Sequence, residues 1–184
     1  MRKTTTAAVA LSIAAVTLGL AVPAQADLYG IDDPQDTFHG SDIRAIQIRN
    51  GKANLNVTTF HSGLRPDPAT GSAGRIYVDT DWNDAGPEYV FVAGFTRGTD
   101  YLLRRTEGFR VDTWGKPVAN GDYIMRVGYA KNRVIFRMSR AALGKPGAVR
   151  VSVVASGTRT DGTSRGLVDW VGKRRSFTPW IKRG

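Results

Sequence analysis

The chain contains no cysteine among its 184 residues and only two histidines, His39 and His61. Without cysteine there is no disulfide, no thiol nucleophile, no Cys-ligated zinc site and no lipid-modified cysteine anchor. The sequence also lacks a Gly-x-Ser-x-Gly elbow, a P-loop and a dinucleotide-binding glycine motif. These absences weigh against an enzyme, while an arrangement of serine, histidine and aspartate assembled only in space stays open.

Long apolar runs are absent except at the N-terminus. Arg2 and Lys3 precede an uncharged apolar stretch from Ala7 to Val22, which is short for a membrane span, and Ala24-Gln25-Ala26 follows it. This layout is typical of a secretory signal peptide with a small-x-small cleavage site. We therefore expect residues 1–26 to be cleaved, and residues 27–184 to form one secreted, extracellular domain.

Acidic residues are scarce in the second half of the chain. Residues 27–90 carry a net charge of −5, whereas residues 91–184 carry +13. One interpretation is a solvated basic surface that keeps the protein soluble, and the other is attraction to a polyanion such as teichoic acid, anionic phospholipid or nucleic acid. The residues predicted to contact a polyanion are Lys173, Arg174, Arg175, Lys182 and Arg183.

Strand patterns dominate the region after the N-terminal segment. Ile43–Arg49 and Lys52–Phe60 flank Asn50-Gly51, which predicts a β-hairpin because both central residues of such a turn need positive φ. In the second of these strands, Leu55 and Val57 point to one face and Asn56 to the other, which indicates one buried and one solvated face.

Further short strands follow at regular intervals. A single helical turn is expected at Arg140–Leu143, with Ser139 as its N-cap and Gly144 as its stop. Many short strands separated by turns predict an all-β fold, a single antiparallel β-sandwich of about eight or nine strands with one short helical turn. The additional expected strands are Arg75–Thr80, Glu88–Phe95, Tyr101–Arg105, Gly108–Trp114, Tyr123–Ala130, Arg133–Ser139 and Ala148–Ala155.

The order of these pieces resembles the β-sandwiches of carbohydrate-binding-module family 9 and the DOMON-like proteins. The similar features are the Asp-rich start and hairpin at Asp36–Phe60, "IYVDTDWNDAGPEYVF" at Ile76–Phe91, and "VIFRMSRAALG" at Val134–Gly144. The resemblance implies binding of sugars, haem or redox cofactors, or an accessory role beside a secreted enzyme. The chain departs from the haem-binding branch because the Met and His ligand pair has no counterpart. It looks more like small stand-alone secreted actinobacterial proteins of unassigned function.

A dense group of carboxylates follows the strand that ends near residue 80. Asp79, Asp81 and Asp84 could share a calcium ion, since calcium takes six to eight oxygen ligands in flexible geometry. The alternative is a polar turn in which Asp84 and Asn83 cap backbone amides. A glycosidase-type pair of carboxylates, Asp79 with Glu88, is also nominally present. A second acidic group, Asp32, Asp33, Asp36 and Asp42, reads as a flexible N-terminus or as part of one shared site with Asp79.

Four tryptophans complete the candidate residues. Trp82 and Trp114 follow strand ends, where loops gather and an exposed indole can stack on a sugar ring, so both are predicted to bind ligand. The alternative for each of the four, Trp170 and Trp180 included, is a buried indole that anchors the core, which is the more common case. Together these features predict a non-catalytic secreted binding module for an envelope or environmental polymer, a polysaccharide or a polyanion. The alternative is a small secreted hydrolase or enzyme inhibitor.

Overall fold

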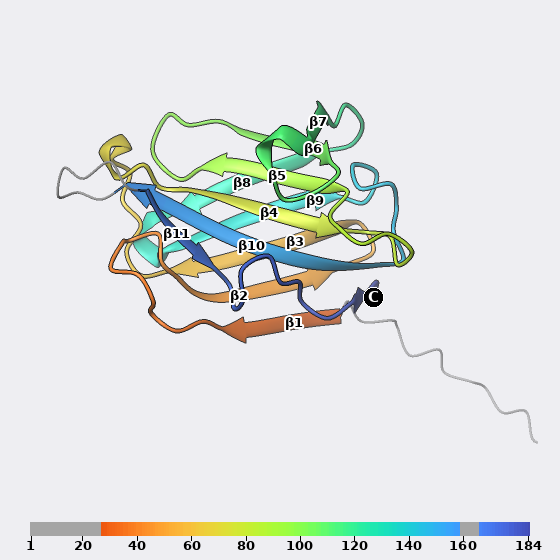
Figure 1. Cartoon of the computed structure of the whole chain (residues 1–184), viewed down its shortest axis with the longest axis horizontal. Coiled ribbons are helices and arrows are strands. Elements are labelled where there is room, and N and C mark those ends of the chain that lie inside the picture. Colours follow the sequence, from red (N-terminus) through yellow and green to blue (C-terminus); the bar gives the residue numbers. More distant parts are fainter. Residues whose placement is uncertain (1–26, 159–165) are drawn as a thin grey trace, which may run out of the picture.

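Two antiparallel β-sheets pack face to face in the computed structural model, which describes residues 27–158 and 166–184 (Figure 1). The signal peptide predicted for residues 1–26 lies outside the described residues. Within the described ranges, no helix is long and apolar enough to cross a membrane.

The smaller sheet is built around the predicted hairpin. The pair β2 and β3 lies at its centre, with β1 added on one side and the β9–β8 hairpin on the other. Its strands, in spatial order, are β1 (Asp27–Asp32), β2 (Ile43–Asn50), β3 (Asn54–His61), β9 (Arg133–Ser139) and β8 (Tyr123–Gly128).

The larger sheet holds the most buried strand of the described chain, β10. Three short 3-10 turns connect strands: η1 (Pro68–Thr70), η2 (Val111–Thr113) and η3 (Tyr129–Lys131). The strands of this sheet, in spatial order, are β11 (Gly166–Trp170), β10 (Ala148–Thr158), β4 (Ala73–Asp79), β5 (Tyr89–Gly94), β6 (Tyr101–Thr106) and β7 (Trp114–Pro117), and β12 (Ile181–Lys182) also pairs with β10.

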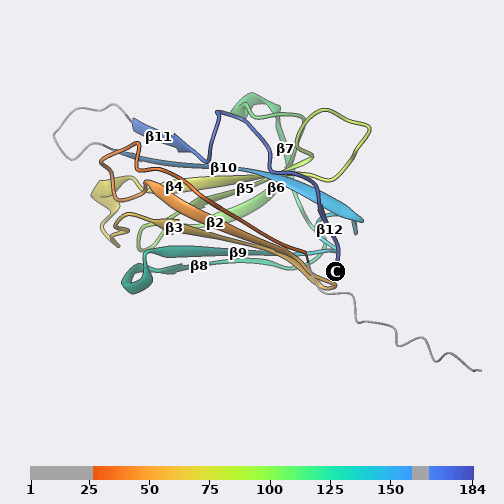
Figure 2. The same cartoon turned by 90° about the horizontal axis from the view of Figure 1, so that it is seen from below.

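The main core lies between the two sheets, and a second apolar layer covers the outside of the larger one. Alternate residues of β3, such as Leu55 and Val57, are fully buried, as the period-two pattern predicts. On the outer face of the larger sheet, Tyr77, Val90 and Val154 form a separate buried cluster. The C-terminal chain lies over this face (Figure 2), which is why β10 is buried on both sides.

The predicted fold class is confirmed, with local differences at the turns. The β2–β3 hairpin forms, but neither Asn50 nor Gly51 has a positive φ. Asn50 instead is buried and donates its side-chain amide to the Ile181 carbonyl oxygen at 2.9 Å. Asn50 pairs with Leu55, so the connection between β2 and β3 is longer than the two-residue turn expected.

Two other expected elements also differ. The segment expected as a strand at Gly108–Trp114 contains η2, and β7 begins only at Trp114. The expected helical turn is a hydrogen-bonded turn in which the Ser139 hydroxyl oxygen accepts from the Ala142 amide at 3.2 Å. Strands β1, β11 and β12 add to the expected set.

Candidate functional site

A groove runs along β6 on the outer face of the larger sheet. Its volume is about 680 Å³. Trp114 forms one wall, and β6 supplies most of the rest. The lining residues are Val92, Asp100, Tyr101, Leu102, Arg104 and Trp114.

Strand register explains why Val92, Leu102 and Arg104 share the outer face of the larger sheet. Val92 pairs with Leu102 and Val90 pairs with Arg104, so Leu102 and Arg104 lie two residues apart on the same side of β6. The Arg104 Nε donates to the Gly115 carbonyl oxygen at 2.9 Å, which ties β6 to β7 beside Trp114. An indole, a guanidinium and a carboxylate around an apolar floor are the features of a pocket for a polar ligand with apolar faces.

Trp82, the other predicted ligand-binding tryptophan, is 60% exposed but stacks on another indole. Its ring lies 4.0 Å from that of Trp180 between centroids, with 16° between the planes. The Arg150 guanidinium lies 5.0 Å from the centroid of Trp180 and 4.7 Å from that of Phe177. One face of Trp82 is therefore already covered by the C-terminal segment.

Two carboxylates of the predicted calcium turn, those of Asp79 and Asp81, accept hydrogen bonds from protein donors. Asp79 is fully buried, and its Oδ2 accepts from the Arg150 Nε at 2.6 Å. Burial outweighs this pairing and raises the pKa of the Asp79 carboxyl. The Oδ1 of Asp81 accepts from the Asn83 amide at 2.9 Å, and Glu88 accepts from Thr80.

These contacts match the capped-turn alternative, with Asp81 and Glu88 rather than Asp84 as the observed acceptors. They leave metal binding by Asp79, Asp81 and Asp84 as a prediction.

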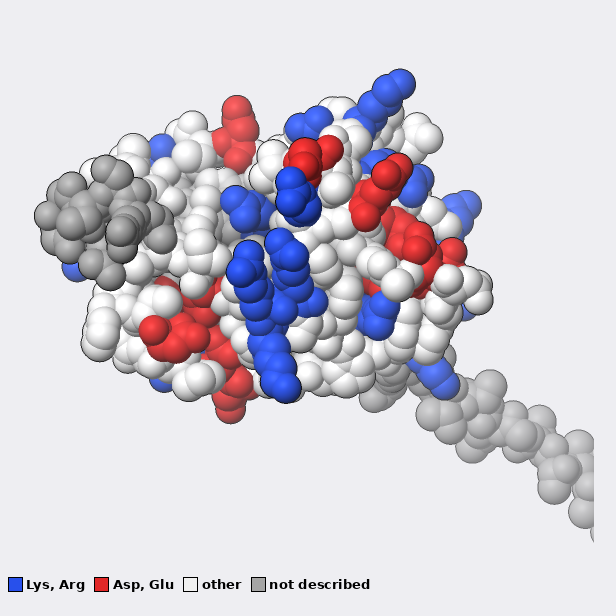
Figure 3. All heavy atoms as spheres, in the orientation of Figure 1, with Lys and Arg blue, Asp and Glu red and all other residues white. Residues whose placement is uncertain are grey.

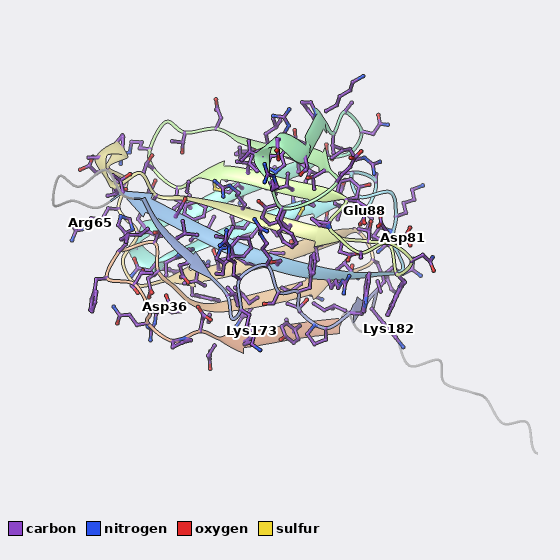
Figure 4. All side chains as sticks on the ribbon, in the orientation of Figure 1. Asp36, Arg65, Asp81, Glu88, Lys173 and Lys182 are labelled. Carbon is purple, nitrogen blue, oxygen red and sulfur yellow. The ribbon has the colours of Figure 1, made fainter. Side chains whose placement is uncertain are left out.

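The predicted polyanion-binding residues divide into two places. Lys173, Arg174 and Arg175 are all exposed in the turn after β11, where Arg175 has a φ of 63°. They contribute to the basic side chains on this face, which lie between two acidic areas (Figure 3). Lys182 lies apart from Lys173 (Figure 4), and Arg183 follows it directly. The structure thus gathers three of the five residues.

The two histidines are both buried. His39 Nδ1 lies 2.7 Å from the Ser41 hydroxyl oxygen, but Ser41 is only 2% exposed. The Ser41 amide also donates to His39 Nδ1 at 3.0 Å, so the contact closes a local turn. A buried serine hydroxyl in such a turn cannot reach a substrate as a nucleophile.

The N-terminal acidic residues are ordered within the fold. Asp33 and Asp42 are buried, and Asp36 and Asp42 meet Asp169 of β11. Figure 4 places Asp36 at the opposite end of the molecule from Asp81 and Glu88. The expectations of a flexible N-terminus and of one site shared with Asp79 were therefore wrong.

Sequence reasoning missed Asp169 because β11 was not predicted. The available signal was a carboxylate between Val168 and Trp170 in an otherwise apolar stretch.

No family model matches this chain, and comparison with curated proteins and with solved structures gave no match either.

Proposed function

We propose that this chain is a secreted, non-catalytic module that binds an extracellular polysaccharide along the β6 groove. The observation that carries the proposal is the groove itself, in which Trp114 lies beside Leu102 and Arg104 on the outer face of the larger sheet. The Tyr101 ring packs on the opposite side of the strand, against Phe91 and Tyr123. Aromatic side chains offer flat apolar surface to a sugar ring, and polar groups beside them fix its orientation. Arg104 and Asp100 supply such groups here.

The groove favours a polymer over a small enclosed substrate. It lies along β6 on the surface of the sheet and is not enclosed by the protein, which suits a segment of an extended polymer. The proposal of hydrolysis has less support, because Asp79 and Glu88 both accept hydrogen bonds from neighbouring protein groups. The resemblance to carbohydrate-binding sandwiches agrees with binding but adds no residue to the groove.

Retention on chitin, cellulose and purified cell wall tests the proposal. We expect Trp114→Ala to weaken retention about tenfold or more, the usual cost of removing a central aromatic contact. Asp100→Asn alters the exposed edge of the groove without removing packing, and should weaken retention more modestly. Trp82→Ala is the matched control, because it removes an indole at the same end of the sheet but outside the groove.

Wild-type retention by Trp114→Ala and Asp100→Asn, in protein that melts normally, would reject the groove as the binding site. Loss of retention in Trp82→Ala alone would move the site to the Trp82–Trp180 stack. Failure of the wild-type protein to bind any of the three polymers at low salt would overturn the polysaccharide proposal.

A further inference from the structure

A cluster of carboxylates joins the two sheets at one end of the sandwich. Asp33 and Asp36 lie in the connection from β1 to β2, Asp42 immediately precedes β2, and Asp169 lies on β11. One carboxylate oxygen from each of Asp36, Asp42 and Asp169 lies within 4.8 Å of the other two. Figure 4 labels Asp36 at this end of the molecule. Among the described residues, this is the single set of three or more potential ligands at such spacing.

Two of these carboxylates are buried with an oxygen left unbonded. Asp169 is 3% exposed, and its Oδ2 accepts from the Ile43 amide at 2.5 Å. Its Oδ1 has no hydrogen-bond partner in the described part of the chain. Asp33 is 6% exposed, and its Oδ1 accepts from the Gly172 amide at 3.0 Å while its Oδ2 lacks a partner among the same residues. Buried carboxylate oxygens normally have partners, since leaving them unpaired is costly.

Both carboxylate oxygens of Asp42 accept hydrogen bonds, and these bonds hold the loop that surrounds the cluster. Its Oδ1 accepts from the Asp36 amide at 3.2 Å and from the Thr37 amide at 2.9 Å. Its Oδ2 accepts from the Ser62 hydroxyl at 2.5 Å. These bonds wrap the loop around Asp42, and so bring Asp36 up to the buried pair.

Among residues 27–158 and 166–184, one protein cation pairs with the carboxylates of the cluster. The one ion pair seen there joins the Arg44 Nη1 to the Asp42 Oδ2 at 3.6 Å, with the Arg44 side chain 41% exposed. Burial, together with the charges of Asp36, Asp33 and Asp42, raises the pKa of Asp169 to about 7, although the Ile43 hydrogen bond acts in the opposite direction. Burial likewise raises the pKa of Asp33. Four carboxylates facing one arginine would be relieved by a bound cation.

We propose that Asp36, Asp42 and Asp169, with Asp33 beside them, form a calcium-binding site that fastens β11 to the β1–β2 connection. The donor set consists of carboxylate oxygens alone, which suits a hard cation better than zinc, whose sites are built mainly from cysteine and histidine. Calcium fits better than magnesium because it accepts several carboxylates at irregular positions, whereas magnesium retains most of its water. This site is independent of the β6 groove.

Thermal unfolding after removal of divalent ions tests the site. An ion that binds only the folded state stabilises it, so calcium at one hundred times its dissociation constant should raise Tm by about 5–10 °C over chelator. We expect this increase to vanish in Asp36→Asn and Asp169→Asn. Asp36 is exposed, so its variant should fold normally. Asp122→Asn is the matched control, because it removes an exposed carboxylate outside both acidic groups and should keep the full increase. Asp84→Asn tests the other acidic turn.

A second readout separates a metal ligand from a residue that only supports the fold. In chelator, Asp169→Asn should melt at or above the wild-type Tm, because it removes buried repulsion while an amide oxygen can still accept from Ile43. In calcium, the wild-type protein should melt at a higher temperature than Asp169→Asn. An unchanged wild-type Tm in calcium, or an equal increase in Asp36→Asn, would overturn the proposal. An increase lost only in Asp84→Asn would assign the ion to the other turn, and an equal increase in magnesium would reject calcium selectivity.

Discussion

His61 illustrates how a single buried side chain is held in one protonation state. Its Nδ1 lies 2.8 Å from the Ser41 carbonyl oxygen, and its Nε2 lies 2.7 Å from the Thr59 hydroxyl. Because a carbonyl oxygen can only accept, Nδ1 must carry the proton and Nε2 must accept from Thr59. Burial lowers the pKa of His61 to about 4, although the Ser41 bond and the charge of Asp42 act in the opposite direction.

We predict that His61 remains neutral in the Nδ1–H form at pH 5.5, where an ordinary histidine is mostly protonated. Nitrogen-15 NMR of the imidazole distinguishes the neutral tautomers from the cation. The same measurement in denaturant is the control, because the unfolded side chain should titrate near 6.5. Protonation of His61 near pH 6.5 in the folded protein would show that the buried hydrogen-bonded arrangement is wrong.

The sequence pattern predicted some strands of the fold and missed others. The alternation along β3 and β10 predicted their positions, because a period of two is a property of the strand itself. Strand β12 was not expected, because it has two residues and is held by β10 and by Asn50, which lies 131 positions away. Strand β1 was not expected either, although it pairs with the next strand along the chain, β2.

The candidate sites likewise combine residues that the sequence pattern predicted with contacts that it did not. Trp114 was predicted to bind ligand from its place near a strand end, but the groove depends on β6 pairing with both β5 and β7. Asp36 and Asp42 were recognised as an acidic group, while their contact with Asp169 brings together residues more than a hundred positions apart. No local pattern encodes such a contact.

The exposed turn at Lys173, Arg174 and Arg175 permits a test of polyanion binding by one segment. We predict that replacing all three residues by Gln lowers the salt concentration that elutes the protein from immobilised teichoic acid. Each basic contact displaces counterions from the polymer, so fewer contacts mean weaker binding and a shallower dependence on salt. Thermal stability should change little, since these side chains are exposed.

The matched control replaces Lys52, Arg97 and Lys116 by Gln, which removes the same charge from exposed positions elsewhere. We expect this variant to elute close to the wild-type protein. Equal elution of the two triple variants would mean that net charge alone causes retention and that the turn is no contact surface. Retention of the first variant in half-molar salt would lead to the same conclusion.

The acidic cluster makes the stability of the whole molecule depend on pH. Asp169 has a pKa of about 7 in the folded protein, well above the value of about 3.9 for an unfolded aspartate. Its contribution to stability is therefore complete below about pH 4, and is lost as pH rises through 7. His61 acts in the opposite direction, since a depressed folded pKa near 4 costs stability as pH falls below about 6.5.

The pH dependences contributed by Asp169 and His61 oppose each other, so the stability of the wild type alone does not separate them. A comparison of the wild type with a variant does. In chelator, the unfolding free energy of Asp169→Asn relative to wild type should rise by a few kcal/mol between pH 4 and 7, since only the wild type must ionise a buried carboxyl. Urea unfolding at intervals across this range measures the difference. Asp84→Asn should follow the wild-type profile throughout.

Calcium should reverse this difference above pH 7, because the ionised Asp169 then has a cation beside it and the Asn variant does not. At pH 5 the proton competes with the ion for Asp169, so calcium should stabilise the wild type less than at pH 8. Parallel profiles for wild type and Asp169→Asn, with and without calcium, would mean that Asp169 neither ionises in this range nor binds the ion. The cluster would then be a protonated packing contact between β11 and the first loop, with no metal involved.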